Sequence, residues 1–188
     1  MKKIISKMIL SLFGWKTSVD EKKELLKCVM IAAPHTSNWD FIFTALTFWK
    51  HDIKFRFFVK DNYTKSFFLG FLARKMGAIG VDRSKGMNLV DFAIDILKKN
   101  KEIVILVPAE GTRKYVKKWK TGFYHIAKGA EVPIALGYLD YKTKTAGVET
   151  LVDITGIMED DFMKIQNFYK NISGKYPELY NPDILGNK

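Results

Sequence analysis

Short apolar runs of strand length alternate along this chain with longer segments whose apolar residues recur at helical spacing. Residues 28–34 (CVMIAAP) and 102–107 (EIVILV) are typical of buried strands, whereas 40–50 (DFIFTALTFWK) and 87–100 (MNLVDFAIDILKKN) are typical of helices. Strands joined through helices form parallel pairs by crossover connections. We therefore expect an α/β fold, with a mixed and mostly parallel sheet flanked by helices.

The other expected elements continue this alternation. We expect further strands at 54–60, 78–83, 132–141 and 147–156, and further helices at 65–77, 122–130 and 160–172. A chain of 188 residues suits one domain with a substantial core. No repeat, low-complexity segment or linker interrupts it. We therefore expect a single domain over residues 17–188, preceded by a distinct segment, residues 1–16.

Residues 1–16 have the pattern of an amphipathic helix with lysines on its polar side. The apolar positions at helical spacing are Ile4, Ile5, Met8, Ile9, Leu12 and Phe13. A secretory signal is disfavoured, because Lys7 interrupts the apolar run and no small-residue cleavage site follows. A membrane-spanning helix needs about 20 apolar residues, and no such run occurs. Two interpretations stay open: a helix lying on a membrane surface, or one packed on the domain.

The net charge of +11 is distributed unevenly. Residues 98–128 hold nine Lys or Arg against two Glu, whereas residues 149–188 are net acidic. A basic region on a small protein meets nucleic acid, an anionic membrane or a phosphorylated substrate, unless it is simply solvated surface. Cations mixed with Tyr115 and Trp119 are typical of a surface at lipid-headgroup level. No nucleic-acid-binding motif occurs, so we expect no nucleic-acid partner.

In parallel sheets, sites form where the carboxyl ends of strands open into loops. His35 follows the first expected strand and lies five residues before Asp40. On a straight helix these positions would be about 140° apart, so a contact requires His35 in a loop and Asp40 at a helix start. An Asp that orients a histidine lets the other ring nitrogen act as a general base. The alternative is a capping Asp beside a structural histidine.

A second candidate loop follows the strand that ends near residue 107. In the sequence Glu110-Gly111-Thr112-Arg113, the glycine permits a close turn, the threonine offers a hydroxyl, and the arginine offers a bidentate fork for an anion. By itself this pattern is only moderately specific for phosphate. No His and Cys cluster has metal-ligand spacing, and the single Cys28 excludes an internal disulfide.

Four blocks taken together are much more specific than any one of them. The blocks are HTSNWD (35–40), GAIGVDR (77–83), EGTR (110–113) and VPIALGYLD (132–140). In the order and spacing of these blocks, the chain resembles the glycerolipid acyltransferases, and most closely the 1-acylglycerol-3-phosphate acyltransferases. The resemblance covers roughly residues 30–141.

The resemblance implies acyl transfer from acyl-CoA or an acyl carrier protein thioester to a lysophospholipid hydroxyl in phospholipid biosynthesis, with 1-acylglycerol-3-phosphate as the leading acceptor. By the same resemblance, His35 would be the catalytic base and Asp40 would orient it. Glu110 and Gly111 would shape the acceptor site, while Arg113 and Arg83 would contact its phosphate. No metal, cofactor or covalent acyl-enzyme is implied. The enzyme would lie on the cytoplasmic face of the plasma or inner membrane, bound to its anionic surface, or in the cytoplasm.

Some neighbours of these residues depart from the family pattern. Pro34 stands where many members have Asn, Ala109 where many have Pro, and Lys114 where Ser is common. These changes leave the chemistry intact but keep a phosphate-free lipid acceptor open as an alternative. A non-enzymatic basic membrane-binding module is the third hypothesis. Residues 66–76 (SFFLGFLARKM) could line an acyl-chain groove, although plain core is the favoured interpretation.

Overall fold

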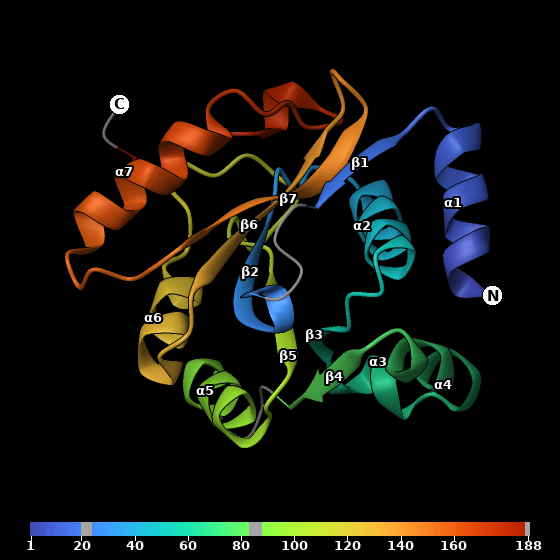
Figure 1. Cartoon of the computed structure of the whole chain (residues 1–188). Coiled ribbons are helices and arrows are strands. Elements are labelled where there is room, and N and C mark those ends of the chain that lie inside the picture. The colour runs from blue at the N-terminus through green and yellow to red at the C-terminus, as the bar shows by residue number, and fades with distance from the viewer. Residues whose placement is uncertain (20–23, 83–87, 187–188) are drawn as a thin grey trace.

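The computed structural model describes residues 1–19, 24–82 and 88–186 (Figure 1). These residues contain one seven-stranded sheet with the strand order β1-β7-β6-β2-β5-β3-β4. The strands are β1 (Lys16–Val19), β2 (Lys27–Ala33), β3 (Phe55–Lys60), β4 (Ala78–Val81), β5 (Ile103–Val107), β6 (Ile134–Asp140) and β7 (Thr145–Val152). From β6 to β4 all neighbours are parallel, β7 is antiparallel to β6, and β1 is parallel to β7. The expected mostly parallel α/β sheet is confirmed.

Helices cover both faces of this sheet (Figure 1). They are α1 (Lys2–Leu12), α2 (Asn38–Lys50), α3 (Asp61–Lys65), α4 (Phe67–Lys75), α5 (Leu89–Lys99), α6 (Gly122–Ala130) and α7 (Met158–Tyr169), with the short 3₁₀ turns η1 (Glu24–Leu26) and η3 (Pro177–Leu179). The figure shows α5, α6 and α7 on one side of the sheet and α2, with α1 outside it, on the other.

The central strand β2 supplies core residues to both faces, because successive side chains of a strand point to opposite sides. Val29 and Ile31 belong to the apolar cluster shared with α5, α6 and α7. Cys28 and Met30 belong to the cluster shared with α2. Burial on both faces explains why this strand is a continuous apolar run in the sequence rather than an alternating one.

Two parts of the fold differ from the sequence-based expectation. The four residues of β1 lack an apolar run and were not expected as a strand; they pair with β7, from Lys16 opposite Thr145 onwards. The helix expected over 65–77 is divided, because Ser66 takes an extended conformation (φ −61°, ψ 136°) between α3 and α4. Both differences depend on tertiary neighbours, which local sequence patterns do not contain.

Helix α1 packs against α2 and still leaves an apolar side exposed. Leu10 is buried on the α2 side, together with the small side chain of Ser6. Four apolar side chains face solvent on the other side: Ile4, Ile5, Met8 and Leu12. One side of α1 is therefore packed on the domain, whereas its other side is exposed and could contact a further partner. Among the described residues, no helix combines the length and apolar character needed to cross a bilayer.

Candidate active site

The candidate site lies where three neighbouring strands end. β2 is hydrogen-bonded to β5 on one side and to β6 on the other, and all three run parallel. Their carboxyl ends therefore meet at the same edge of the sheet. His35 follows β2, Glu110 follows β5, and Tyr141 follows β6. Residues 75 and more positions apart in the sequence thus come together at this edge.

The loop after β2 is held by the cap of helix α2. Ser37 is the N-cap residue, and its side chain accepts a hydrogen bond from the backbone N–H of Trp39 at 3.2 Å. Asp40 completes a capping box, since its Oδ2 accepts from the backbone N–H groups of Ser37 at 2.7 Å and Thr36 at 2.8 Å. The carboxylate is therefore fixed in position before any substrate binds.

This cap brings Asp40 close to His35. As expected, His35 lies in a loop and Asp40 in the first turn of a helix. His35 Nδ1 lies 3.4 Å from Asp40 Oδ2. That separation exceeds a hydrogen bond of roughly 2.7–3.2 Å, and such looseness is common before a substrate is bound. Asp40 is buried, whereas the histidine side chain is 23% exposed and lines a cavity. Because Nδ1 faces the carboxylate, Nε2 on the other side of the ring is the nitrogen placed to take a proton.

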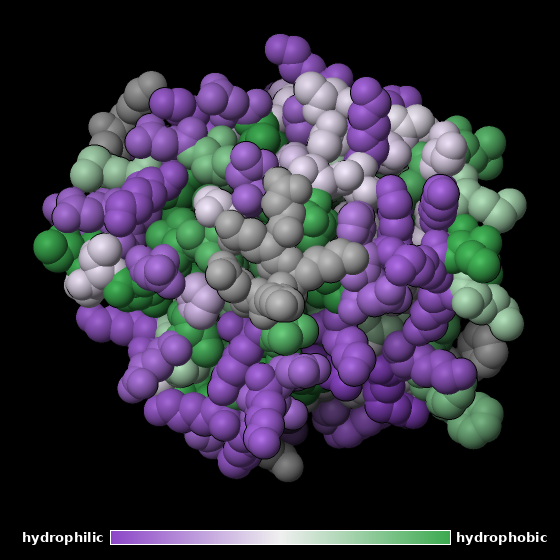
Figure 2. All heavy atoms as spheres, in the orientation of Figure 1, coloured by the Kyte–Doolittle hydropathy of each residue, from purple (hydrophilic) through white to green (hydrophobic). Residues whose placement is uncertain are grey.

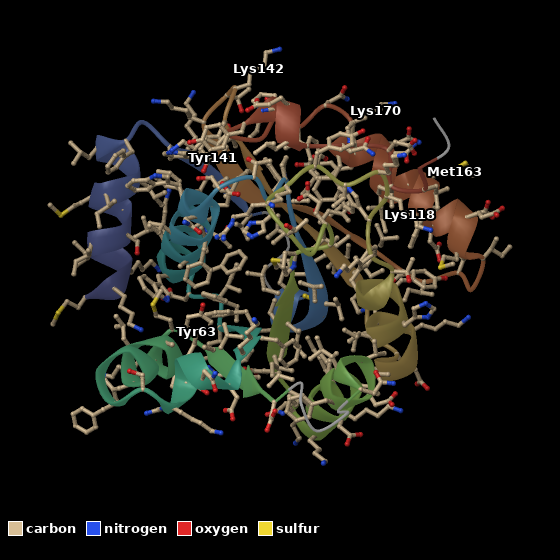
Figure 3. The ribbon with its side chains drawn as sticks, turned by 180° about the vertical axis from the view of Figure 1, so that it is seen from behind. Tyr63, Lys118, Tyr141, Lys142, Met163 and Lys170 are labelled. Atoms are coloured by element: carbon tan, nitrogen blue, oxygen red, sulfur yellow. The ribbon has the colours of Figure 1, made fainter. Side chains whose placement is uncertain are left out.

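Tyr141 is a further residue of this group, and no motif in the sequence indicated it. Its hydroxyl donates a hydrogen bond of 2.8 Å to Asp40 Oδ1, the carboxylate oxygen opposite the one that faces His35. Burial, this hydrogen bond and the carboxylate charge all raise the pKa of Tyr141, so the phenol keeps its proton. The only signal in the sequence was a polar residue at the end of the strand that neighbours β2. Figure 3 labels Tyr141, which comes from the loop after β6.

Glu110 accepts a hydrogen bond from the backbone of the loop after β2. Its Oε2 accepts a hydrogen bond of 2.6 Å from the backbone N–H of His35, and the side chain is almost fully buried. Burial raises the pKa of Glu110 to about 7, and the charge of Asp40 acts in the same direction, while the His35 N–H opposes both. This carboxyl therefore ties the loop after β5 to the loop after β2.

The remaining predicted substrate residues follow in the turn after Glu110. Gly111 takes a positive φ of 70°, a conformation that favours glycine. Arg113 turns back toward the start of α2, where its Nη1 donates a hydrogen bond to Asn38 Oδ1. Thr112 Oγ1 accepts from the backbone N–H of Lys114 at 3.3 Å and so shapes the turn; its role in substrate binding stays a prediction. Arg83 lies outside the described residues.

A cavity of about 820 Å³ opens beside the histidine. His35, Asp40, Gly111 and Arg113 line it together with Lys120. Most of its other walls are apolar, with side chains from the strands β2, β3, β5 and β6 and from the helices α2, α5 and α6. Its volume is typical of ligand pockets, of roughly 300–1,000 Å³. A cationic rim beside an apolar interior suits a ligand with an anionic head and a hydrocarbon tail.

Other groups near the site have structural roles. The thiol of Cys28 is buried within the sheet, and burial raises its pKa to about 12, which removes the thiolate needed for nucleophilic attack. Trp119 was expected at headgroup level but is buried, and its Nε1–H donates to the Asn181 carbonyl at 2.9 Å. The expectation for Trp119 was therefore wrong, because the chain after η3 folds over it. Among the described residues, no group of three His, Cys, Asp or Glu is arranged to hold a metal.

A family model described as Acyltransferase matches residues 17–135, which is more than half of the chain and includes both HTSNWD and EGTR. The chain belongs to the acyltransferase family. The resemblance seen in the ordered blocks is thereby confirmed at the level of the family and of the enzyme class.

A solved structure has the same fold as this acyltransferase. It is the 1-acyl-sn-glycerophosphate (LPA) acyltransferase PlsC from Thermotoga maritima, with a TM-score of 0.62 and 15% sequence identity. The match covers 90% of this acyltransferase and 75% of PlsC. At this identity the likeness concerns the fold alone. A search of curated protein sequences finds no significant match.

Proposed function

We propose that this acyltransferase moves a fatty acyl group from an acyl thioester to the hydroxyl of 1-acylglycerol-3-phosphate. The observation that carries the proposal is the contact of His35 Nδ1 with Asp40 Oδ2 at the rim of a cavity that Arg113 also lines. A base, an anion-binding fork and an apolar interior at one cavity match the hydroxyl, phosphate and tail of such an acceptor.

In the proposed reaction, Nε2 of His35 removes the proton of the acceptor hydroxyl as its oxygen attacks the thioester carbonyl. Asp40 stabilises the imidazolium that forms, and Tyr141 holds that carboxylate from its other side. Collapse of the tetrahedral intermediate breaks the carbon–sulfur bond. The proton then passes from His35 to the departing thiolate, which leaves an ester and a free thiol.

Arg113 would bind the acceptor phosphate after exchanging its hydrogen bond with Asn38 for the ligand. The donor would be acyl-CoA or an acyl carrier protein thioester, with no metal or other cofactor. The exposed apolar side of α1, flanked by Lys2, Lys3 and Lys7, would lie on an anionic membrane surface at the cytoplasmic face.

The test is an assay with purified full-length protein, both thioester donors and 1-acylglycerol-3-phosphate, following thiol release and the diacyl product by mass spectrometry. We expect His35→Ala to lower kcat by at least about a thousandfold. His125→Ala is the matched control, because His125 is exposed on α6. Turnover by His35→Ala at the wild-type rate would overturn the base assignment. Faster turnover of a phosphate-free monoacylglycerol would overturn the choice of acceptor while leaving acyl transfer in place.

A further inference from the structure

Helices α3 and α4 carry an apolar surface that the structure leaves in contact with solvent. It consists of Tyr63, Phe67, Phe71 and Leu72, which we name the α3–α4 face; Phe67 is 97% exposed and Tyr63 64%. Core packing, the interpretation favoured for residues 66–76, is therefore wrong for Phe67, Phe71 and Leu72. The reason is their place in the fold, since α4 packs beside β4, the last strand of the sheet.

Specific contacts hold the corner between α3 and α4 in place. Arg74 Nη1 donates a hydrogen bond to the carbonyl oxygen of Thr64. A Cβ on Gly70 would collide with the same oxygen, so the glycine permits the close approach of α4 to the end of α3. These contacts fix the direction in which the α3–α4 face points. A surface of large apolar side chains held outward in this way marks a binding surface.

The charged residues around this face indicate what kind of partner it binds. Residues 54–75 contain six Lys or Arg, all exposed, and a single acid, Asp61. Lys75 Nζ also lies 5.0 Å from the centre of the Phe71 ring. Aromatic side chains with cations around them are complementary to an anionic bilayer, where the rings enter the headgroup layer and the ammonium groups meet lipid phosphates.

The face is continuous with the cavity of the candidate active site. Tyr63, one of the four residues of the face, also lines the cavity that begins at His35. Three residues of β3, the strand that leads into α3, line the same cavity: Phe57, Phe58 and Val59. An apolar path therefore connects the cavity interior to the exposed face. Figure 3 shows Tyr63 on the side of the molecule that carries α3 and α4.

The exposed side of α1 lies on the same flank of the molecule. In Figure 1, α1 is at the right and α4 at the lower right. Figure 2, in the same orientation, shows apolar atoms along the right edge over α1 and again at the lower right over α4, with hydrophilic atoms along the bottom. One bilayer could thus contact both surfaces.

We propose that the α3–α4 face docks on an anionic lipid bilayer and that lipid tails pass between the bilayer and the cavity beside Tyr63. The docking follows from the exposed rings and cations. The passage of tails rests on the proposed function, because it requires a lipid acceptor. This surface acts in addition to α1 and lies next to the cavity, so it would set the position of the cavity mouth against the membrane.

The first experiment measures binding of full-length protein to vesicles containing 30% phosphatidylglycerol in phosphatidylcholine. We expect Phe67→Ser/Phe71→Ser to weaken partitioning roughly tenfold or more, and Phe67→Leu/Phe71→Leu to retain it. The matched control is Ile157→Ser/Met163→Ser, which removes two other exposed apolar side chains, one just before α7 and one within it. Figure 3 shows Met163 on the side of the molecule away from α3 and α4. Circular dichroism and melting temperature establish that each variant is folded.

A second measurement reports whether a labelled position enters the bilayer. A polarity-sensitive fluorophore is attached to Phe67→Cys or to Met163→Cys; the native Cys28 is buried and does not compete for the label. We expect a blue shift on adding vesicles for position 67 and none for position 163. Wild-type binding by the folded Phe67→Ser/Phe71→Ser variant, or equal spectra at both positions, would overturn the proposal. A change of oligomeric state in solution without vesicle binding would also overturn it, in favour of a second copy as the occupant.

These readouts need no turnover, so they separate the two proposals. If the protein binds vesicles through the α3–α4 face but transfers no acyl group, the proposed function is wrong and the proposed docking surface stands. If the protein transfers acyl groups and the Phe67→Ser/Phe71→Ser variant binds vesicles as wild type does, the docking surface is wrong and the proposed function stands.

Discussion

The hydroxyl of Tyr141 donates a hydrogen bond of 2.8 Å to Oδ1 of Asp40, whose Oδ2 faces His35. The two residues are 101 positions apart in the chain and meet because β2 and β6 are adjacent strands. Trp15, in the connection between α1 and β1, packs edge-on against the ring of Tyr141 at 5.0 Å between centroids. Tyr141, which lies outside the recognised blocks, thus holds Asp40, the residue proposed to orient the proposed base His35. Tyr141 also contacts the chain that leaves α1.

Tyr141→Phe should therefore lower kcat about tenfold with little change in KM for either substrate. Loss of a hydrogen bond to a charged group removes about 1.5 kcal/mol, and a tenfold rate change corresponds to about 1.4 kcal/mol. The control is Tyr124→Phe, which removes a 3.1 Å hydrogen bond to the buried Asp161 away from the strand ends. Tyr124→Phe should lower the melting temperature but not kcat. If Tyr141 acts through Asp40, adding Tyr141→Phe to Asp40→Asn should cause little further loss; full additivity would contradict this coupling.

Asn38→Asp should raise KM for the phosphate-bearing acceptor about tenfold and leave kcat nearly unchanged. The new carboxylate would pair with Arg113, which now donates to the Asn38 amide oxygen, and would compete with the acceptor phosphate. An acid in the first turn of α2 is compatible with the helix. Asn167→Asp is the matched control, because Asn167 Oδ1 also accepts from a cation, Lys170 Nζ, at 3.1 Å. An unchanged KM would show that Arg113 does not bind the phosphate.

Glu110→Gln should remove a pH dependence of stability. The pKa of Glu110 is about 7 in the fold against an ordinary value of 4.5. The folded state then holds a proton that the unfolded state has lost, so this group stabilises the fold below about pH 4.5, and its contribution is lost as the pH rises to 7. The shift corresponds to about 3 kcal/mol. Urea unfolding from pH 4.5 to 8 should show wild type losing stability relative to Glu110→Gln, whereas parallel curves would contradict the shift. Glu178→Gln, at an exposed position, is the control.

Ile4→Ser/Met8→Ser/Leu12→Ser should weaken binding to anionic vesicles while leaving the melting temperature close to wild type. These side chains are exposed, and Leu10, which packs α1 on α2, is unchanged. Co-sedimentation with anionic vesicles, again with Ile157→Ser/Met163→Ser as control, measures the effect. Binding equal to wild type would leave α1 as a packing element only. Combination with the Phe67→Ser/Phe71→Ser variant should weaken binding further, because the two surfaces are separate segments of one flank.

Much of the fold was predictable because its main signals are local. The continuous apolar run of β2, the alternation of strands with helices and the helix over 122–130 all arise from short-range periodicity, and the structure has them. β1 and the interruption at Ser66 were not predictable in this way. The strand exists because β7 pairs with it, and the helix is divided where the chain turns beside the edge strand β4.

The sequence by itself determined the class of sheet and the requirement that His35 stand in a loop with Asp40 at a helix start, because helical geometry allows no other contact at that spacing. It also carried the ordered blocks that indicate acyl transfer. Only the tertiary structure decided that Tyr141 bonds Asp40, that Glu110 bonds the His35 backbone, and that Phe67 and Phe71 face solvent. The physical reason is that hydrogen bonds between strand ends and exposure at a sheet edge depend on the order of strands in space, which adjacency along the chain does not specify.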